Sequence, residues 1–427
     1  MNITLFANIF PPDIGGGATR AFNIAMCLIQ QGHNLQIVTS VPHYPSGLPI
    51  LKALRLSEEK HGSWWILRLP TSGLPHKGFL RRVINYCWYS VFCLVCFTKV
   101  RYSDVVFCIG PHPFTDFPAY LFKKVKGAKM LVDISDLWPE TVPIGSSLGN
   151  TLLQGVGYVL NRIVLRIFSD GLCIYNKRAL KFIKSRYDYK KPAVIIENFA
   201  DTNLFIYNKK AKTDKEILTK LMPTLQKSRF VVLYHGVIGP YQRIENVVKA
   251  AKIAQNIPQV LFVIVGDGER KERALKLMKE EGLTNIVFLP TMSRRLVSEI
   301  VAESDLGLVP IVSNNPLTIY VSMPIKATEF LASGTPILAP AGSYIGNIVS
   351  NAQAGFEVDF RNPSEIHQFV KWAVAHPLLF QKMRKRARQV SVNRFSYKHA
   401  CETLHSMIRL VTRCRRKGGD ATFSRWQ

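Results

Sequence analysis

The sequence predicts an α/β protein built from two consecutive domains, each with a parallel sheet. Short apolar runs alternate with helical patterns almost throughout the chain, which is typical of parallel strands joined by crossover helices. The alternation stops in a polar, charged segment at 198–228 and then starts again. With 427 residues, of which 47% are hydrophobic, the chain is large enough to bury two cores.

The expected strands fall into two groups. In the first half they are Ile3 to Asn8, Leu35 to Thr39, Trp64 to Leu69, Val105 to Ile109, Met130 to Ile134, Leu172 to Tyr175 and Ala193 to Ile196. In the second half they are Phe230 to Tyr234, Leu261 to Val265, Ile286 to Leu289, Leu306 to Val309, Pro336 to Ala339 and Phe356 to Val358. This grouping predicts domains over 1–200 and 201–390, followed by a helix and a basic tail over 391–427.

The chain carries a strong positive charge. Lys and Arg number 56 against 29 Asp and Glu, a formal net charge of +27. Such an excess indicates an anionic partner, and nucleic acid, an acidic membrane surface and a phosphate-bearing substrate all qualify. The densest group flanks the apolar run Val83 to Thr98; its members are Lys77, Arg81, Arg82, Lys99, Arg101, Lys123, Lys124 and Lys126.

The apolar run Val83 to Thr98 has two interpretations. It includes Asn85 and is shorter than the roughly 20 residues that a spanning helix needs. An apolar helix with cationic flanks suits attachment to the surface of an anionic membrane. A buried core helix with solvated flanks explains the same pattern, and the sequence leaves both open.

The cysteines and the N-terminus indicate a reducing compartment. The eight cysteines mostly lie in apolar runs, where we expect buried free thiols. Cys93 and Cys96 have no second pair and no histidine at ligand spacing, so no metal or redox site is expected there. The first residues lack the pattern of a secretion signal, and we expect a cytoplasmic protein at the inner face of the cell membrane.

A glycine-rich turn follows the first expected strand. In "FPPDIGGGATR", Gly15, Gly16 and Gly17 stand between that strand and a helical pattern. A strand, a glycine turn and a helix present backbone N–H groups and the positive helix end to an anion, most often a phosphate. No acidic residue ends the next strand, so a dinucleotide site is disfavoured. A tight turn without a ligand is the simpler alternative.

A second anion-binding pattern occurs in "VSMPIKATEFLASGTPILAP". Pro324 stands where a helix begins, Lys326 adds a cation to its first turn, and Glu329 follows one turn later. The free N–H groups and Lys326 suit a diphosphate, while a carboxylate at Glu329 suits the two hydroxyls of a ribose. A surface lysine and glutamate on an amphipathic helix are the alternative.

Four segments, in this order and spacing, resemble the retaining glycosyltransferases of family four: "FPPDIGGGATR", "SDLWPET", "GDGER" and "MPIKATEFLASGTPILAP". Within the family the chain is most similar to the branch of O-antigen and colanic-acid sugar transferases. The resemblance implies the GT-B fold, in which two Rossmann-like domains face each other across a cleft. It also implies a nucleotide sugar on the C-terminal domain, an acceptor on the N-terminal domain, and Gly15 to Gly17 facing the donor diphosphate.

On the donor side, the sequence departs from the family pattern at two places. Relatives often have a second glutamate eight residues before Glu329, where this chain has Val321. Many also place an arginine and a lysine after the first strand of the second domain, where Val237 and Gln242 stand here. Arg243 is adjacent and could neutralise the leaving diphosphate in their place, and a solvated charge at a helix start is the alternative reading.

The resemblance also suggests the remaining donor-site residues. Gly236 and Gly239 would let their loop approach the donor closely, and Gly266 belongs to a turn near the nucleoside. The backbone near Thr291 would recognise the base. Gly266 could instead serve only as a turn residue.

On the acceptor side, "LVDISDLWPET" ends a buried strand and carries Asp133, Asp136 and Trp138. Asp136 and Glu140 are placed to bond sugar hydroxyls, with Trp138 as a stacking wall, and a capped helix start is the alternative reading. His112 follows another strand end, near the position of a catalytic histidine in relatives. A loop histidine without function explains it as well.

The sequence therefore predicts a retaining hexosyl- or N-acetylhexosaminyl-transferase that uses a nucleotide-diphosphate sugar, with UDP as the expected carrier. We expect a lipid-linked or surface-polysaccharide acceptor and no added cofactor. No Asp-x-Asp occurs, so no metal site is indicated. A GT-B-fold UDP-N-acetylglucosamine 2-epimerase is an alternative enzyme. A basic nucleic-acid-binding protein is an alternative of another class, although the chain lacks a known nucleic-acid-binding motif.

Overall fold

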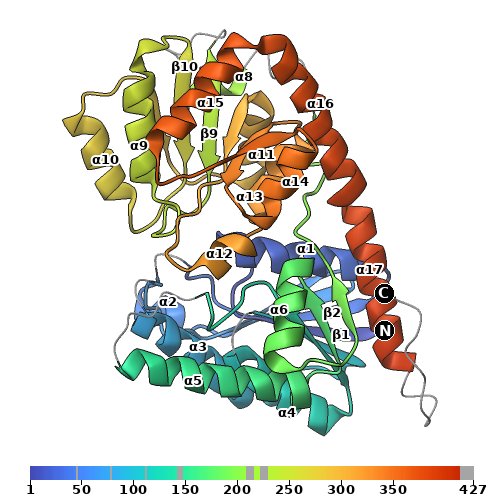
Figure 1. Ribbon diagram of the computed structural model, residues 1–427. Coiled ribbons are helices and arrows are strands. Elements are labelled where there is room, and N and C mark those ends of the chain that lie inside the picture. The colour runs from blue at the N-terminus through green and yellow to red at the C-terminus, as the bar shows by residue number, and fades with distance from the viewer. Residues whose placement is uncertain are drawn as a thin grey trace.

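The computed structural model describes residues 1–44, 47–76, 79–110, 113–141, 148–207, 216–221 and 229–413. It shows two α/β domains, one above the other in Figure 1, each with a central sheet between layers of helices. The predicted α/β class and the division into two sheets are confirmed.

The N-terminal sheet has 8 strands in the order β3-β4-β2-β1-β5-β6-β7-β8, and all neighbours are parallel except β3 and β4. The register places Ile3 of β1 between Leu35 of β2 and Val105 of β5. The strands are β1 (Asn2–Ala7), β2 (Asn34–Ser40), β3 (Ser57–His61), β4 (Trp64–Leu69), β5 (Val105–Ile109), β6 (Lys129–Ile134), β7 (Gly171–Ile174) and β8 (Ala193–Ile195).

Helices cover both faces of this sheet. One face buries side chains of the first and the last helix of the described chain, and the other buries side chains of α3, α4 and α6. The helices of this domain are α1 (Gly16–Gln30), α2 (Ile50–Ala53), α3 (Phe79–Val95), α4 (Pro113–Lys126), α5 (Leu148–Ile163) and α6 (Lys177–Tyr187), with short helical turns at Phe97–Lys99 and Val164–Phe168.

The C-terminal sheet has 6 parallel strands in the order β11-β10-β9-β12-β13-β14. The strands are β9 (Phe230–His235), β10 (Val260–Val265), β11 (Ile286–Leu289), β12 (Leu306–Leu308), β13 (Ile337–Pro340) and β14 (Gly355–Val358). The helices are α8 (Glu216–Leu221), α9 (Ile244–Ile253), α10 (Lys271–Glu280), α11 (Arg294–Glu303), α12 (Pro316–Tyr320), α13 (Ile325–Ala332), α14 (Tyr344–Asn351), α15 (Pro363–Ala375), α16 (Pro377–Arg394) and α17 (Tyr397–Arg413), with a turn at Ala254–Asn256.

The strand predictions are confirmed to within about two residues at each end. Parallel strands covered on both faces read as continuous apolar runs, and β10 shows this, since all of its residues are buried. The strand that sequence patterns miss is β3, whose residues Ser57–His61 are polar and partly exposed at the antiparallel edge of the sheet.

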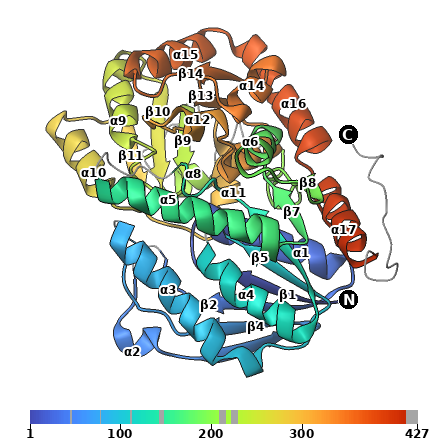
Figure 2. The same cartoon turned by 60° about the horizontal axis from the view of Figure 1, so that its bottom comes forward.

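The chain crosses between the domains twice, and the two crossings lie side by side. Ala200 in the first crossing pairs with Ser396 in the second. Arg394 at the end of α16 donates two hydrogen bonds to Glu197, at 2.9 and 2.8 Å. After the second crossing, α17 packs against the N-terminal domain, as Figures 1 and 2 show.

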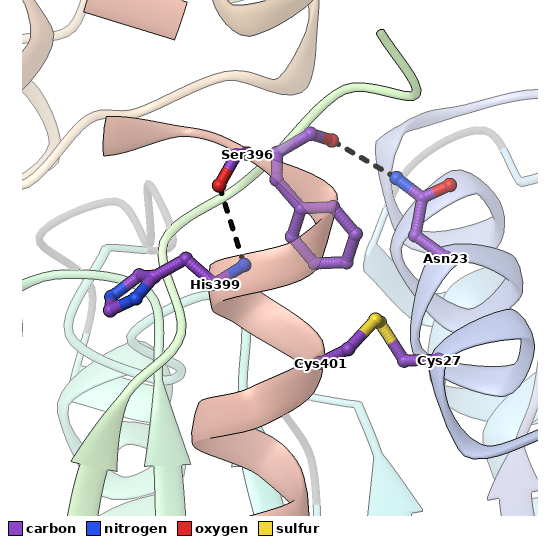
Figure 3. The surroundings of a disulfide bond; sticks show 6 residues. Asn23, Cys27, Ser396, His399 and Cys401 are labelled. Carbon is purple, nitrogen blue, oxygen red and sulfur yellow. Dashed lines mark hydrogen bonds between the residues drawn. A yellow bond between two sulfur atoms is a disulfide. The ribbon is translucent and has the colours of Figure 1, made fainter. Parts of the chain in front are cut away.

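Buried free thiols were expected at the cysteines in apolar runs, and this prediction is wrong for Cys27 and Cys401. Cys27 of α1 and Cys401 of α17 form a disulfide across a sequence separation of 374 (Figure 3). The return of α17 onto α1 brings the two residues together, a contact that neither local sequence indicates. Cys93 and Cys96 are free and buried, and the described residues contain no cluster of potential metal ligands.

The apolar run after Val83 forms most of α3, which has two different faces. Tyr89 and Cys93 are buried in the core, whereas Val91 and Val95 are 54% and 68% exposed. Within the described ranges, no helix has both the length and the apolar character to cross a membrane. The run is therefore a core helix that also presents apolar side chains to the outside.

Candidate active site

The predicted donor residues lie on α13, at the carboxyl ends of the C-terminal strands. The helix begins after Pro324, as predicted, and its first turn places Lys326 beside Gly236, the residue after β9. The Lys326 Nζ atom lies 3.9 Å from the centre of the Tyr234 ring. Gly236 has a φ of +123°, and a Cβ atom there would lie 3.0 Å from Lys326 Nζ. The backbone conformation thus favours glycine at 236, and a Cβ atom there would crowd the end of the Lys326 side chain.

The Lys326 ammonium is poorly solvated. Burial lowers its pKa to about 7, although the nearby Glu329 carboxylate favours the charged form. A lysine with a pKa near 7 is partly uncharged at neutral pH. A bound anion restores its charge, because an opposite charge raises the pKa again. Perturbed groups of this kind are typical of ligand sites.

Glu329 lies one turn further along α13 and is 7% exposed. Its Oε1 atom accepts a hydrogen bond from Arg294 Nη2 at 3.1 Å, and its Oε2 atom lies 3.7 Å from His235 Nε2. Burial raises the pKa of Glu329, while Arg294 and Lys326 act in the opposite direction. Burial also lowers the pKa of His235 to about 3, so this ring is neutral, and its Nε2 atom is buried without a hydrogen-bond partner.

The glycine turn precedes α1 at the carboxyl end of β1. Gly15 has a φ of +146°, and α1 begins at Gly16. A Cβ atom on Gly16 would meet nothing within 4 Å, whereas one on Gly17 would lie 3.0 Å from the Ile9 side chain. Helix α1 packs against α13, so both candidate anion sites belong to the same domain boundary.

The remaining predicted donor residues lie in loops at the same end of the C-terminal sheet. Gly266 has its backbone against Gly236, since a Cβ atom there would lie 2.0 Å from the Gly236 carbonyl oxygen. Gly239 N–H donates to the Gln242 side chain at 3.2 Å. Arg243 and Thr291 are exposed, in the loops that precede α9 and α11.

On the acceptor side, Asp133 and Asp136 differ sharply. Asp133 is fully buried and paired with Arg20 of α1 at 2.6 Å, so its role is structural. Asp136 is accessible, and its Oδ1 atom accepts a hydrogen bond from Thr141 Oγ1 at 2.9 Å. Crowding by neighbouring protein groups desolvates this carboxyl group and raises its pKa. Glu140 accepts a hydrogen bond from the Tyr187 hydroxyl group.

The Asp136 loop contacts the C-terminal domain directly. Tyr241 OH donates to the Thr141 carbonyl oxygen at 3.1 Å, and Asn315 Nδ2 donates to the Glu140 carbonyl oxygen at 2.5 Å. Figure 1 shows α12, which follows Asn315, between the two domains. The predicted catalytic residue His112 lies outside the described residues.

A groove of about 740 Å³ lies away from all predicted site residues, between α6, α14 and α16. Its lining includes Arg178 and Arg394, whose guanidinium groups bond carbonyl oxygens and Glu197 respectively. These arginines therefore tie the domains together. The candidate active site remains the boundary between α1 and α13.

Sequence patterns miss three residues of this site. His235 ends β9 and could have been found, because parallel sheets bind ligands at the carboxyl ends of strands. Arg294 and Asn23 carry no local signal, since they meet Glu329 and each other only through tertiary packing.

Comparison with known proteins agrees with the geometry. Residues 222–390 match the family described as Glycosyl transferases group 1. The colanic acid biosynthesis glycosyl transferase named WcaI, of Escherichia coli, is 24% identical over 81% of this chain and 84% of its own length. The chitobiosyldiphosphodolichol beta-mannosyltransferase of Candida glabrata is 21% identical over 70% of this chain and 69% of its own.

Solved structures show the same architecture. Sucrose-phosphate synthase of Thermosynechococcus elongatus superposes with a TM-score of 0.76 at 14% identity, over 97% of this chain and 100% of that one. WaaG, a glycosyltransferase of lipopolysaccharide biosynthesis, superposes with a TM-score of 0.69 at 14% identity, over 98% of this chain and 100% of that one. Anabaena HepE in complex with UDP-glucose superposes with a TM-score of 0.67 at 15% identity, over 96% of this chain and 100% of that one. The chain has the two-domain GT-B fold, and its family match and relatives support a glycosyltransferase.

Proposed function

We propose that the protein transfers a hexosyl or N-acetylhexosaminyl group from a UDP-sugar to a lipid-linked or surface-polysaccharide acceptor, with retention of configuration. The observation that carries the proposal is the start of α13, where Lys326 lies beside Gly236 and Glu329 follows one turn later, packed against α1. Structural neighbours that bind UDP and UDP-glucose favour this donor.

The proposed donor site stabilises a leaving diphosphate. Negative charge grows on the diphosphate as the glycosidic bond breaks, so donors fixed in advance should dominate the rate. Lys326 and the free N–H groups at the start of α13 would meet the phosphates from one side, and those at Gly16 and Gly17 from the other. Arg243 is exposed directly before α9, and in this proposal it adds a further positive charge for the leaving diphosphate.

Retention requires attack from the face that the leaving group vacates. We infer front-face attack assisted by the leaving phosphate, without a covalent protein intermediate, a metal or an added cofactor. On the acceptor side, the raised pKa of Asp136 makes its carboxylate a suitable acceptor for the proton of the attacking hydroxyl. His112 remains a second candidate for this step.

The outer helices of the N-terminal domain are the proposed membrane surface. Figure 2 shows α3, α4 and α5 side by side on the face that comes forward. Exposed apolar side chains on them include Val91, Val95, Phe117, Val125, Val156 and Val159. No acidic residue occurs from Lys60 to Tyr102 or from Thr141 to Ser169. Apolar groups within a cationic surface suit an anionic membrane, on its cytoplasmic side.

The cations of this surface differ in their freedom to bind lipid. Lys123 is held by Asp170 at 2.7 Å, and Arg82 Nε donates to the His76 carbonyl oxygen at 3.3 Å. Arg81, Lys124, Arg162 and Arg166 are exposed on α3, α4, α5 and the turn after α5. These four residues are therefore the better candidates for lipid contact.

Binding and product analysis test the proposal together. Calorimetry with UDP, GDP and CDP should show tightest binding of UDP, and mass analysis with a lipid diphosphate acceptor should show a glycosylated lipid. A 2-epimerase would instead consume the sugar nucleotide without any acceptor. The family match does not favour that enzyme or a nucleic-acid-binding protein. Absence of nucleoside-diphosphate binding would overturn the proposal.

A further inference from the structure

Arg294, the first residue of α11, contacts both domains at once. Its Nη2 atom donates a hydrogen bond to Glu329 Oε1 at 3.1 Å, and its Nη1 atom donates one to Asn23 Oδ1 at 3.3 Å. Asn23 belongs to α1, the helix that follows the glycine turn. One guanidinium group therefore joins the proposed ribose-binding carboxylate to the opposite domain.

Asn23 is itself fixed. It is 4% exposed, and its Nδ2 atom donates to the Phe199 carbonyl oxygen at 3.1 Å, a bond that Figure 3 shows beside the disulfide of the same helix. Its Oδ1 atom therefore presents a fixed acceptor to Arg294. A shift of α1 relative to the C-terminal domain would break the contact between the two side chains.

A second buried connection runs parallel to this one. Arg20 of α1 donates to Asn198 Oδ1 at 2.8 Å, and Asn198 Nδ2 donates to the Met323 carbonyl oxygen at 2.5 Å. Met323 directly precedes the proline at the start of α13. Helix α13 is thus tied to α1 at its beginning through Met323 and one turn later through Glu329.

Burial strengthens the electrostatic interaction between Arg294 and Glu329. The side chain of Glu329 is 9% exposed and that of Arg294 is 29% exposed, so water screens the pair much less than a surface pair. The Arg294 Nε atom is buried without a hydrogen-bond partner.

We propose that Arg294 is a positioning residue of the donor site, which orients Glu329 and, through Asn23, makes that orientation depend on the packing of the two domains. The inference rests on the proposed function, in which Glu329 holds the donor ribose. A carboxylate has about four lone-pair positions, and Arg294 occupies one of them. The others remain available to two ribose hydroxyls.

The charges around Glu329 give the proposal a pH signature. Arg294 on α11, Lys326 on α13 and His235 on β9 are the titratable groups that face the carboxyl group. His235 is neutral, so two cations oppose the effect of burial. Without Arg294 the pKa of Glu329 rises further, and a larger fraction of the carboxyl group is protonated as the pH falls.

Calorimetry with UDP and 2′,3′-dideoxy-UDP at pH 6 and pH 8 tests this role. Arg294→Gln should weaken UDP binding about tenfold or more, with the larger loss relative to wild type at pH 6. Binding of the dideoxy compound should barely change. Arg294→Lys should remove the pH effect but not the whole loss. The matched control is Arg295→Gln, because Arg295 is 85% exposed on the same helix and should leave binding unchanged.

The link to α1 is tested by a double-mutant cycle. Asn23→Ala should weaken UDP binding by about two- to tenfold, and the double variant with Arg294→Gln should lose less than the two single losses combined. Equal losses for both ligands, or fully additive losses, would overturn the positioning role. Wild-type protein that binds no nucleoside diphosphate would overturn the proposed function, and this inference with it.

Discussion

The donor side of the C-terminal domain and the outer helices of the N-terminal domain both carry charge, but in different surroundings. Lys326 and Glu329 lie within a packed boundary, where burial shifts the pKa of each. Arg81, Lys124 and Arg162 stand in solvent. A buried charge responds to a single neighbour and to pH, whereas exposed charges are screened by salt and each contributes little. The first set suits one specific ligand, and the second suits a surface.

The largest effect expected from this contrast comes from Glu329→Gln. Loss of a buried charged acceptor should cost about 1.5 to 3 kcal/mol, or roughly ten- to more than a hundred-fold in affinity for UDP. Binding of 2′,3′-dideoxy-UDP should change little, because that ligand offers no hydroxyls to the carboxylate. Isothermal calorimetry with both ligands measures the difference. Equal losses for the two ligands would show that Glu329 does not hold the ribose.

A smaller effect is expected for membrane binding by the exposed cations, and it is measured best when two of them are replaced together. Arg81→Gln combined with Lys124→Gln should weaken binding to anionic liposomes by about 2 kcal/mol, roughly thirtyfold, because each cation near the surface contributes about 1 kcal/mol. Liposome sedimentation at low salt measures this change, and UDP affinity should stay constant. Lys123→Gln is the matched control, since Lys123 is already held by Asp170. Unchanged sedimentation of the double variant would exclude this membrane surface.

The smallest effect concerns the pH dependence of donor binding. Lys326 has a pKa of about 7 in the free protein, so it is protonated below that pH and neutral above it. If only the protonated form binds the diphosphate, affinity should fall about tenfold between pH 6 and pH 8. Phosphate groups titrate near pH 6 themselves, so Lys326→Met provides the baseline. Parallel pH profiles for wild type and variant would contradict the assignment.

The sequence predicts the frame of the donor site well, because that frame is local. Pro324, Lys326 and Glu329 lie on one helix, so their spacing alone places the cation and the carboxylate one turn apart. The partners of Glu329 are not local. Arg294 and Asn23 reach the site only when two domains pack together, and no periodicity or motif records such a contact.

The same distinction separates correct from incorrect fold predictions. Buried parallel strands such as β10 can be predicted from their unbroken apolar runs. Strand β3 is missed because it lies at the edge of the sheet, where its residues are polar. The expectation of free thiols fails for Cys27 because its partner, Cys401, lies far along the chain. His112 and its predicted role lie outside the described residues, so that hypothesis stands as the sequence left it.

The return of α17 to the N-terminal domain has a consequence for how this chain matures during synthesis. Leu404, Met407 and Ile408 belong to the same buried cluster as β1 and β5, and Gly171 of β7 leaves room for the Met407 side chain. When the first domain emerges from the ribosome, one of its two helical layers is therefore still incomplete. That layer closes only after residues 397–413 have been made, so the first domain to be translated is the last to be finished.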